Sequence, residues 1–314
     1  MLLRRFFIAL SGNPRAQSFV LHNGLARRAS RRFIAGETLE EGIEAVRAIN
    51  RLGVHASLNY LGEKTTSPQL AESATDMYIR VLDAIHTGGL DCNLSIKLSQ
   101  LGLAIDESLA ASHLRRILEA ALRRNLFVRI DMEESPLVDP TLRIWRRMRA
   151  EGFTNVGVVI QAYLYRSASD VEALVREGAR IRLVKGAYLE PPSLAFPRKR
   201  DVDENYRRLM EFLLRSGDYP AIATHDEKLI THAKTFAARE GIPPSQFEFQ
   251  MIYGVRRDLQ RSLAQEGYNV RVYIPFGEHW YPYFMRRLAE RPANVLFLLR
   301  SVLAERAGGI RADV

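Results

Sequence analysis

The chain has 314 residues, of which 47% are hydrophobic and 26% charged, so it can bury one large core and is long for a single domain other than a barrel-type α/β fold. No stretch of 18 apolar residues occurs, and the sequence therefore predicts no membrane-spanning helix. The single cysteine, Cys92, excludes an internal disulfide, and we expect it to be a small buried side chain.

The net charge of +9 is concentrated at the amino terminus. Residues 1–36 contain seven arginines, no lysine and no acidic residue, so they carry +7 of the +9. A nucleic-acid-binding protein would spread its basic residues through the fold, so we expect an arm and no nucleic acid. We favour an amphipathic helical arm on a protein or membrane surface, with a solvated helical cap or a transit peptide as alternatives. A secretory signal is excluded because Arg4 and Arg5 interrupt the apolar run.

From Gly53 onward, short apolar runs alternate with longer segments of helical periodicity. Each run is rich in β-branched residues and has the length of a strand, whereas each longer segment has the length of a helix. We predict strands at 54–60, 91–99, 126–132, 155–163, 180–188, 220–225, 247–253 and 269–275. We predict helices at 69–88, 108–125, 139–152, 169–178, 201–216, 226–241, 256–267 and 280–290.

Local patterns indicate the ends of several helices. Ser108 is a capping residue at the start of one segment, and Asp139-Pro140 begins the next, since proline suits the first turn of a helix. Glycine follows five of the predicted helices, where a left-handed cap favours it: Gly88, Gly152, Gly178, Gly241 and Gly267.

Eight strand–helix units predict a parallel sheet that closes into a (β/α)8 barrel of the TIM type. No low-complexity segment or linker divides it. We therefore expect a basic helical arm packed on the barrel at residues 1–52, a catalytic barrel at 53–300, and a carboxyl-terminal tail at 301–314.

Polar residues stand at the ends of the predicted strands, and in such a barrel the carboxyl ends of the strands form the active site. Alternation in the second strand places Ser95, Lys97 and Ser99 on one face, and a lysine backed by apolar residues needs an anionic partner. Asp131 in the third strand is the candidate partner. The remaining polar positions are Gln161, Arg182, Lys185, Thr224, His225, Gln250 and Tyr273, followed in the last helix by Arg286, Arg287 and Glu290.

The fixed cations in this set predict an anionic ligand. Paired guanidinium groups suit a carboxylate, and Lys185-Gly186-Ala187 would suit a phosphorylated ligand because glycine lets a ligand approach the backbone. The cations are Lys97, Arg182, Lys185, Arg286 and Arg287.

Other chemistries receive less support. No Ser-His-Asp order and no reactive-cysteine setting is present, so a hydrolytic nucleophile is not predicted. His225 and His232 lack clustered carboxylates, so we predict no metal, and no GxGxxG motif indicates a Rossmann domain. Two alternatives stay open: a barrel lyase or aldolase that uses Lys97 as a Schiff base, and a non-enzymatic adaptor that binds through residues 1–36.

At these positions the sequence resembles the proline dehydrogenase family. The KGAY and YFMRRLAERPAN segments are specific to that family, because a barrel alone does not require them. The arm and its GETLEEG continuation also resemble the helical lead-in of single-function bacterial members. The resemblance rests on LGEKTTS (61–67), SIKLSQLG (95–102), RIDMEE (129–134), QAYL (161–164), IRLVKGAYLE (181–190), IATHDEKLI (222–230), FEFQMIYGV (247–255) and VYIPFGEHWYPYFMRRLAERPANV (272–295).

The resemblance implies a distorted (β/α)8 barrel that holds FAD noncovalently and oxidises L-proline to Δ1-pyrroline-5-carboxylate, the first step of proline catabolism to glutamate. A hydride would pass to flavin N5 and the electrons to a quinone, with the protein supplying position and electrostatics. No dedicated base for the proline amine is evident. A quinone acceptor implies a cytoplasmic protein in peripheral contact with the inner face of the cell membrane, which the basic arm would assist by attraction to anionic lipid.

The resemblance also implies roles by position. Asp131 would pair with Lys97 and shape the site, Arg182 would stabilise the negative charge of the reduced flavin, and Glu63 would close over substrate by pairing with an arginine. Leu189 departs from the family, which often has Trp there, and is not a candidate. The substrate would contact Lys97, Tyr188, Tyr273, Arg286 and Arg287, with Glu290 orienting the arginines, and the flavin nucleotide would contact Met132, Gln161, Arg182, Lys185, Gly186, Ala187, Thr224 and His225.

Overall fold

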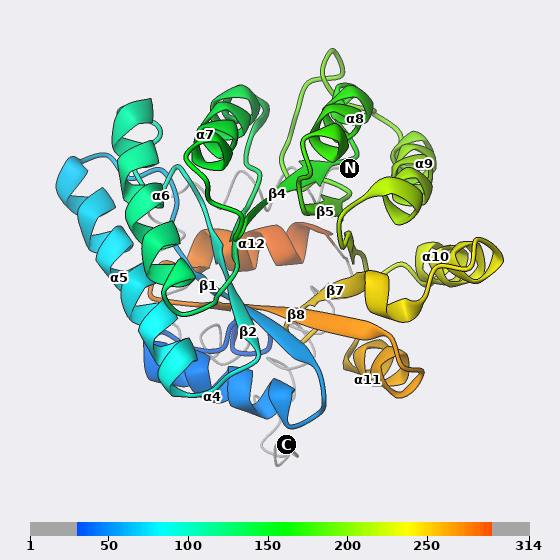
Figure 1. Ribbon diagram of the computed structural model, residues 1–314, viewed down its shortest axis with the longest axis horizontal. Coiled ribbons are helices and arrows are strands. Elements are labelled where there is room, and N and C mark those ends of the chain that lie inside the picture. Colours follow the sequence, from blue (N-terminus) through cyan, green and yellow to red (C-terminus); the bar gives the residue numbers. More distant parts are fainter. Residues whose placement is uncertain (1–29, 291–314) are drawn as a thin grey trace, which may run out of the picture.

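The structure, a computed structural model, describes residues 30–290. Eight parallel strands form a closed barrel in sequence order, and β8 pairs with β1 to complete it (Figure 1). This confirms the predicted (β/α)8 barrel. The strands are β1 His55–Tyr60, β2 Cys92–Ile96, β3 Val128–Ile130, β4 Val156–Gln161, β5 Ile181–Val184, β6 Ala221–Ala223, β7 Glu248–Ile252 and β8 Asn269–Phe276.

Helices surround the barrel, and each predicted helix has a counterpart. Short 3₁₀ helices, η1 Ser135–Leu137 and η2 Pro244–Gln246, precede α7 and β7. No helix of the described part is long and apolar enough to cross a membrane. The α-helices are α4 Leu39–Asn50, α5 Pro68–Thr87, α6 Glu107–Leu122, α7 Val138–Ala150, α8 Ser167–Arg176, α9 Lys199–Ser216, α10 Glu227–Arg239, α11 Arg257–Gln265 and α12 Trp280–Glu290.

Two helices give the barrel its distortion. In a regular barrel the helix after β8 joins the outer ring, but here α4 packs against β1 and β8. Gly42 of α4 permits this close approach, because a Cβ there would lie 3.1 Å from the ring of Phe276. The helix that follows β8, α12, lies across the middle of the ring in Figure 1. Its aromatic residues pack with Phe33, Ile34 and Leu61 in a second apolar cluster.

The helix ends differ in detail from the predictions. Helix α6 begins one residue before Ser108, and its cap is Asp106, whose carboxylate accepts a hydrogen bond from the Leu109 N–H at 2.7 Å. Four of the five predicted glycines have positive φ. Gly88 does not, because it continues the helical turn at φ −77°, and the reversal falls on Gly89 at φ +57°.

Most strands are shorter than predicted, because the alternating pattern continues into the loops at their carboxyl ends. Strand β3 ends at Ile130 and β5 at Val184, so Asp131 and Lys185 stand at the start of the following loops. Lys97 likewise follows the last residue of β2.

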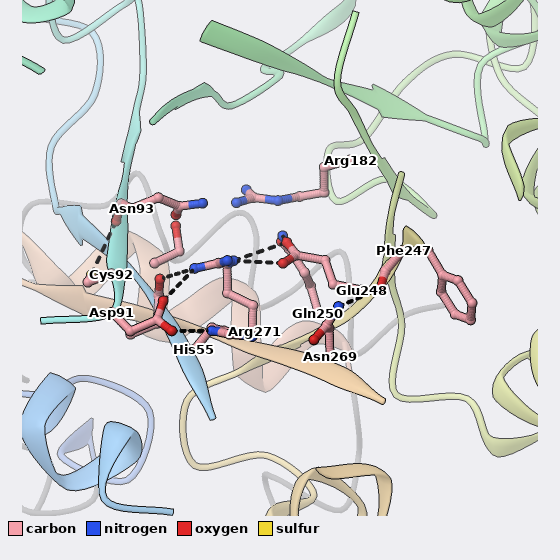
Figure 2. Close-up of polar contacts among 12 residues, drawn as sticks. His55, Asp91, Cys92, Asn93, Arg182, Phe247, Glu248, Gln250, Asn269 and Arg271 are labelled. Atoms are coloured by element: carbon pink, nitrogen blue, oxygen red, sulfur yellow. Dashed lines mark hydrogen bonds and ion pairs between the residues drawn. The ribbon is translucent and has the colours of Figure 1, made fainter. Parts of the chain in front are cut away.

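The apolar core lies between the sheet and the helices, whereas the inner face of the barrel is polar. Ile96 and Ile130 belong to the core, while the hydroxyls of Ser57 and Ser95 meet inside the barrel at 2.9 Å. Most barrels of this type fill the same space with Val, Ile and Leu. Figure 2 shows part of this polar interior, in which Arg271 lies between Asp91 and Glu248.

Candidate active site

Asp131 is the centre of the polar cluster at the carboxyl ends of the strands. One carboxylate oxygen accepts a hydrogen bond from Arg182 Nη1 at 2.7 Å, and the other accepts one from the Tyr273 hydroxyl at 2.7 Å. Lys97 Nζ lies 3.8 Å from the second oxygen, which confirms the predicted pair. Side-chain exposure is only 12% for Asp131 and 9% for Lys97, so solvent screens these charges weakly.

Arg182 connects this cluster to the interior of the barrel. Its Nη2 donates to the Ser95 hydroxyl at 3.0 Å, and its guanidinium lies 5.4 Å from the centre of the Tyr273 ring. Its buried Nε has no acceptor among the described residues. Burial, followed by the charge of Asp131, raises the pKa of Tyr273 well above its usual value, so this hydroxyl stays protonated and donates to Asp131.

Glu63 and Arg286 form an ion pair at the mouth of the barrel. Arg286 donates two hydrogen bonds to the two carboxylate oxygens, at 2.8 and 3.1 Å. Burial raises the pKa of Glu63, but the charge and hydrogen bonds of Arg286 outweigh that effect and leave the pKa below its ordinary value. The expectation that Glu63 pairs with an arginine of α12 is confirmed in this geometry.

Of the other predicted substrate contacts, the structure describes Tyr188 and Arg287. Burial, followed by the charge of Glu133, raises the pKa of Tyr188 well above its usual value, and Arg286 opposes the shift. The guanidinium of Arg287 lies 5.0 Å from the Tyr283 ring, and Arg287 is buried. The side chain of Glu290 lies outside the described residues.

The predicted cofactor residues lie at the ends of β3, β4, β5 and β6. Gln161 Nε2 donates to the Glu133 carbonyl at 2.8 Å. Gly186 has φ +118°, and a Cβ at that position would collide with the Tyr163 ring. Only glycine therefore fits where the backbone passes this ring. Met132 is buried, and Ala187 is half-buried in the loop after β5.

Lys185, Thr224 and His225 form a second group of polar residues. Lys185 Nζ contacts Asp203 at 2.6 Å and Asp226 at 2.9 Å, so its charge is already compensated. The Thr224 hydroxyl accepts from the Asp226 N–H at 3.1 Å. His225 Nε2 accepts from the Ile252 N–H at 2.9 Å, which leaves the proton of a neutral imidazole on Nδ1.

Sequence reasoning missed several residues that complete the site. Ser95 appeared only as a member of the strand face, and Glu133 was quoted only within a motif. Glu133 is buried, and it accepts from both the N–H and the hydroxyl of Ser99. Asp203 and Asp226, the partners of Lys185, come from α9 and the start of α10. Adjacency to His225 could have indicated Asp226, but no local pattern indicates Asp203.

The structure also describes the two histidines and the cysteine that the sequence analysis considered. His232 pairs with Glu211 at 2.6 Å, away from the partner of His225, and no group of three metal-ligating side chains occurs within residues 30–290. Cys92 is buried as predicted, and burial raises the pKa of its thiol to about 12. Leu189 is 49% exposed. Most of the predicted basic arm and the whole predicted tail, at 1–29 and 301–314, lie outside the described residues.

A closed parallel barrel with buried, paired charges at the carboxyl ends of its strands defines a (β/α)8-barrel enzyme. Comparison with known proteins identifies the family. The sequence profile described as proline dehydrogenase matches residues 42–300, and the chain belongs to the proline dehydrogenase family.

Full-length relatives support this assignment. Proline dehydrogenase 1 of Bacillus subtilis subsp. natto is 44% identical over 96% of this chain and 99% of its own length. Proline dehydrogenase of Deinococcus radiodurans is 46% identical over 87% of this chain and 89% of its own length.

Among solved structures, a mutant of proline utilization A from Bradyrhizobium japonicum is similar to this chain with a TM-score of 0.73 and 26% identity, over 88% of this chain and 32% of its own. Proline utilization A from Bdellovibrio bacteriovorus superimposes with a TM-score of 0.79 at 24% identity, over 90% of this chain and 34% of its own, and shares the fold. The chain thus spans about a third of these structures.

Proposed function

We propose that this protein oxidises L-proline to Δ1-pyrroline-5-carboxylate with FAD as cofactor and a quinone as electron acceptor. The observation that carries the proposal is the cluster of Asp131, Lys97, Arg182 and Tyr273 beneath the Glu63–Arg286 pair. These residues supply cations for a substrate carboxylate. The family evidence agrees, because full-length relatives of this chain carry the name proline dehydrogenase.

The polar groups around Arg182 fit a flavin. Its buried Nε lacks an acceptor within the described structure, and a flavin ring offers carbonyl oxygens and ring nitrogens as acceptors. FAD would supply the two-electron acceptor of the reaction. Arg182 would hold negative charge at the ring, a role that needs no reorganisation because Asp131 and Ser95 already orient the guanidinium.

The remaining contacts to the nucleotide follow the strand ends. Lys185 forms ion pairs with Asp203 and Asp226. A bound phosphate would therefore compete with these two aspartates for the ammonium group of Lys185. Such a shared cation binds a phosphate more weakly than a free lysine. The other proposed contacts are Met132, Gln161, Gly186, Ala187, Thr224 and His225.

The substrate carboxylate would bind between Lys97 and the arginines of α12. Arg286 now donates to Glu63, and a substrate carboxylate would compete with Glu63 for the same planar donors. Arg287 would be the second cation, with Glu290 orienting the pair, and Tyr188 and Tyr273 would pack against the ring.

Asp131 serves this site as a positioning group and not as a base. Its two oxygens already accept hydrogen bonds from Arg182 and Tyr273, and Lys97 lies close to one of them. Donors therefore already occupy both oxygens of this carboxylate. The proline amine would therefore lose its proton to solvent before oxidation.

A quinone acceptor requires contact with a membrane, and we propose peripheral association with the inner face of the cell membrane. Residues 1–52 would form the arm, 53–300 the catalytic barrel and 301–314 the tail. Attraction of the arginines in 1–36 to anionic lipid would assist association.

Flavin content and dye-coupled activity test this function. Purified protein should release about one FAD per chain on denaturation, and L-proline should reduce an artificial dye in its presence. Deletion of residues 1–29, which leaves Phe33 and Ile34 in the apolar cluster with α12, should retain this soluble activity and weaken partitioning into liposomes. A chain that neither contains nor takes up FAD would overturn the proposal.

A further inference from the structure

Arg129 is a buried cation inside the barrel that the proposed reaction does not use directly. It lies on β3 between Val128 and Ile130, pairs in register with Gly157 of β4, and is 2% exposed. A Cβ on Gly157 would lie 2.6 Å from Arg129 Nη1. Glycine therefore makes the room that the guanidinium occupies.

The contacts of Arg129 are neutral. Its Nη1 donates to the carbonyl oxygens of Val158, at 3.3 Å, and of Arg180. The guanidinium lies 4.9 Å from the centre of the Phe127 ring. No acceptor for its Nε occurs among the described residues, and within 30–290 no carboxylate oxygen lies within the 4.0 Å that defines an ion pair.

The carboxylates of the interior are bound to other cations. Glu248 accepts two hydrogen bonds from Arg271, both at 3.0 Å (Figure 2), and Asp131 accepts from Arg182. Arg129 is therefore a third interior arginine beside two paired ones. Burial, followed by the charge of Arg182, lowers the pKa of Arg129 to about 9, so it is still protonated at neutral pH.

An unpaired buried charge is expensive, and an apolar residue of similar volume often improves stability. A barrel that keeps such a charge beneath its site gains a stronger positive potential there. Lys97, Arg182 and Asp131 together carry +1, and Arg129 adds a second positive charge one layer below, about 7 Å from Asp131 along the strand.

We propose that Arg129 acts at a distance as an electrostatic positioning residue, which raises the positive potential at the strand ends and stabilises negative charge on the bound flavin. The inference rests on the proposed function. It assigns a role to a residue whose described contacts are all with the protein. Because its guanidinium is held by two carbonyls and a ring, its charge needs no rearrangement when the flavin is reduced.

The test compares Arg129→Met with Arg123→Met. Arg123 is exposed at the end of α6, so the control removes the same charge far from the site. The readouts are the midpoint potential of the bound FAD and its affinity for sulfite, which adds to oxidised flavin to give an anionic adduct. Arg129→Met should lower the midpoint potential and weaken sulfite binding about tenfold. This factor is the interaction of one unit charge on Arg129 with one on the flavin, about 12 Å apart at an effective dielectric constant of about 20. Arg123→Met should change neither.

Arg129→Gln is a second neutral variant if the Met variant folds poorly. A folded neutral variant with unchanged potential and sulfite affinity overturns the proposal, and so does failure of both variants to fold, because the guanidinium would then be a structural group. Wild-type protein that binds no FAD would instead refute the proposed function, so the two failures are distinct.

Discussion

Replacement of Asp131 by Asn should destabilise the protein by removing a charge that two buried cations share. Arg182 Nη1 lies 2.7 Å from one oxygen and Lys97 Nζ lies 3.8 Å from the other, and the three side chains are 5 to 12% exposed. Asn is nearly isosteric and keeps an oxygen for one donor, so the main loss is the charge. Breaking a buried pair from one side costs about 3–5 kcal/mol, and we expect the free energy of unfolding to fall by about 3 kcal/mol.

The assay is urea unfolding followed by circular dichroism, with and without added FAD, because a ligand that binds the native state adds to the apparent stability. Tyr273→Phe is the control that removes only one hydrogen bond to Asp131, and it should cost about 1.5 kcal/mol. The double variant Asp131→Asn/Lys97→Met should recover about 1 kcal/mol relative to Asp131→Asn, since it removes one stranded cation. A loss below about 1 kcal/mol for Asp131→Asn, or strict additivity in the double variant, would refute the reasoning.

Three further predictions concern other parts of the structure. Arg286→Met should raise the KM for proline at least about tenfold, since a charged hydrogen bond contributes about 1.5–3 kcal/mol, and steady-state kinetics with an unchanged KM would remove the carboxylate assignment. The pKa of Glu63 is lowered in the folded protein. The ionised carboxylate therefore stabilises the fold fully above its unfolded pKa of about 4.5, and this stabilisation is lost as the pH falls through the lower pKa of the folded protein. The gap in urea midpoint between wild type and Glu63→Gln should therefore shrink in acid, and a constant gap would contradict this. Cys92, with a thiol pKa of about 12, should react with a thiol reagent at pH 8 only after unfolding, and fast labelling of the native protein would contradict its burial.

The sequence was sufficient to predict the barrel because every strand–helix unit repeats one local pattern. Alternation also placed Lys97 and Asp131 correctly, since two adjacent parallel strands end at the same edge of the sheet. The structure confirms that pair.

Long-range packing explains what could not be predicted. Periodicity identifies an amphipathic helix but not the surface that it covers. No local pattern therefore predicted that α4 would pack on β1 and β8 or that α12 would lie across the barrel (Figure 1). The partners of Lys185 come from α9 and α10, and only the closed barrel brings them together. Arg129 has the spacing of an inward residue. That it has no carboxylate partner within residues 30–290 depends on where Glu248 and Arg271 lie.

The most direct test of the proposed activity is anaerobic reduction of the bound flavin. When L-proline is mixed with the oxidised protein in the absence of oxygen, the visible absorbance of FAD should bleach in a single turnover. Pyrrolidine, which lacks the carboxylate that Lys97, Arg286 and Arg287 are proposed to bind, should bleach it far more slowly at the same concentration. A flavin that L-proline leaves oxidised, or that both compounds reduce at equal rates, would contradict the account.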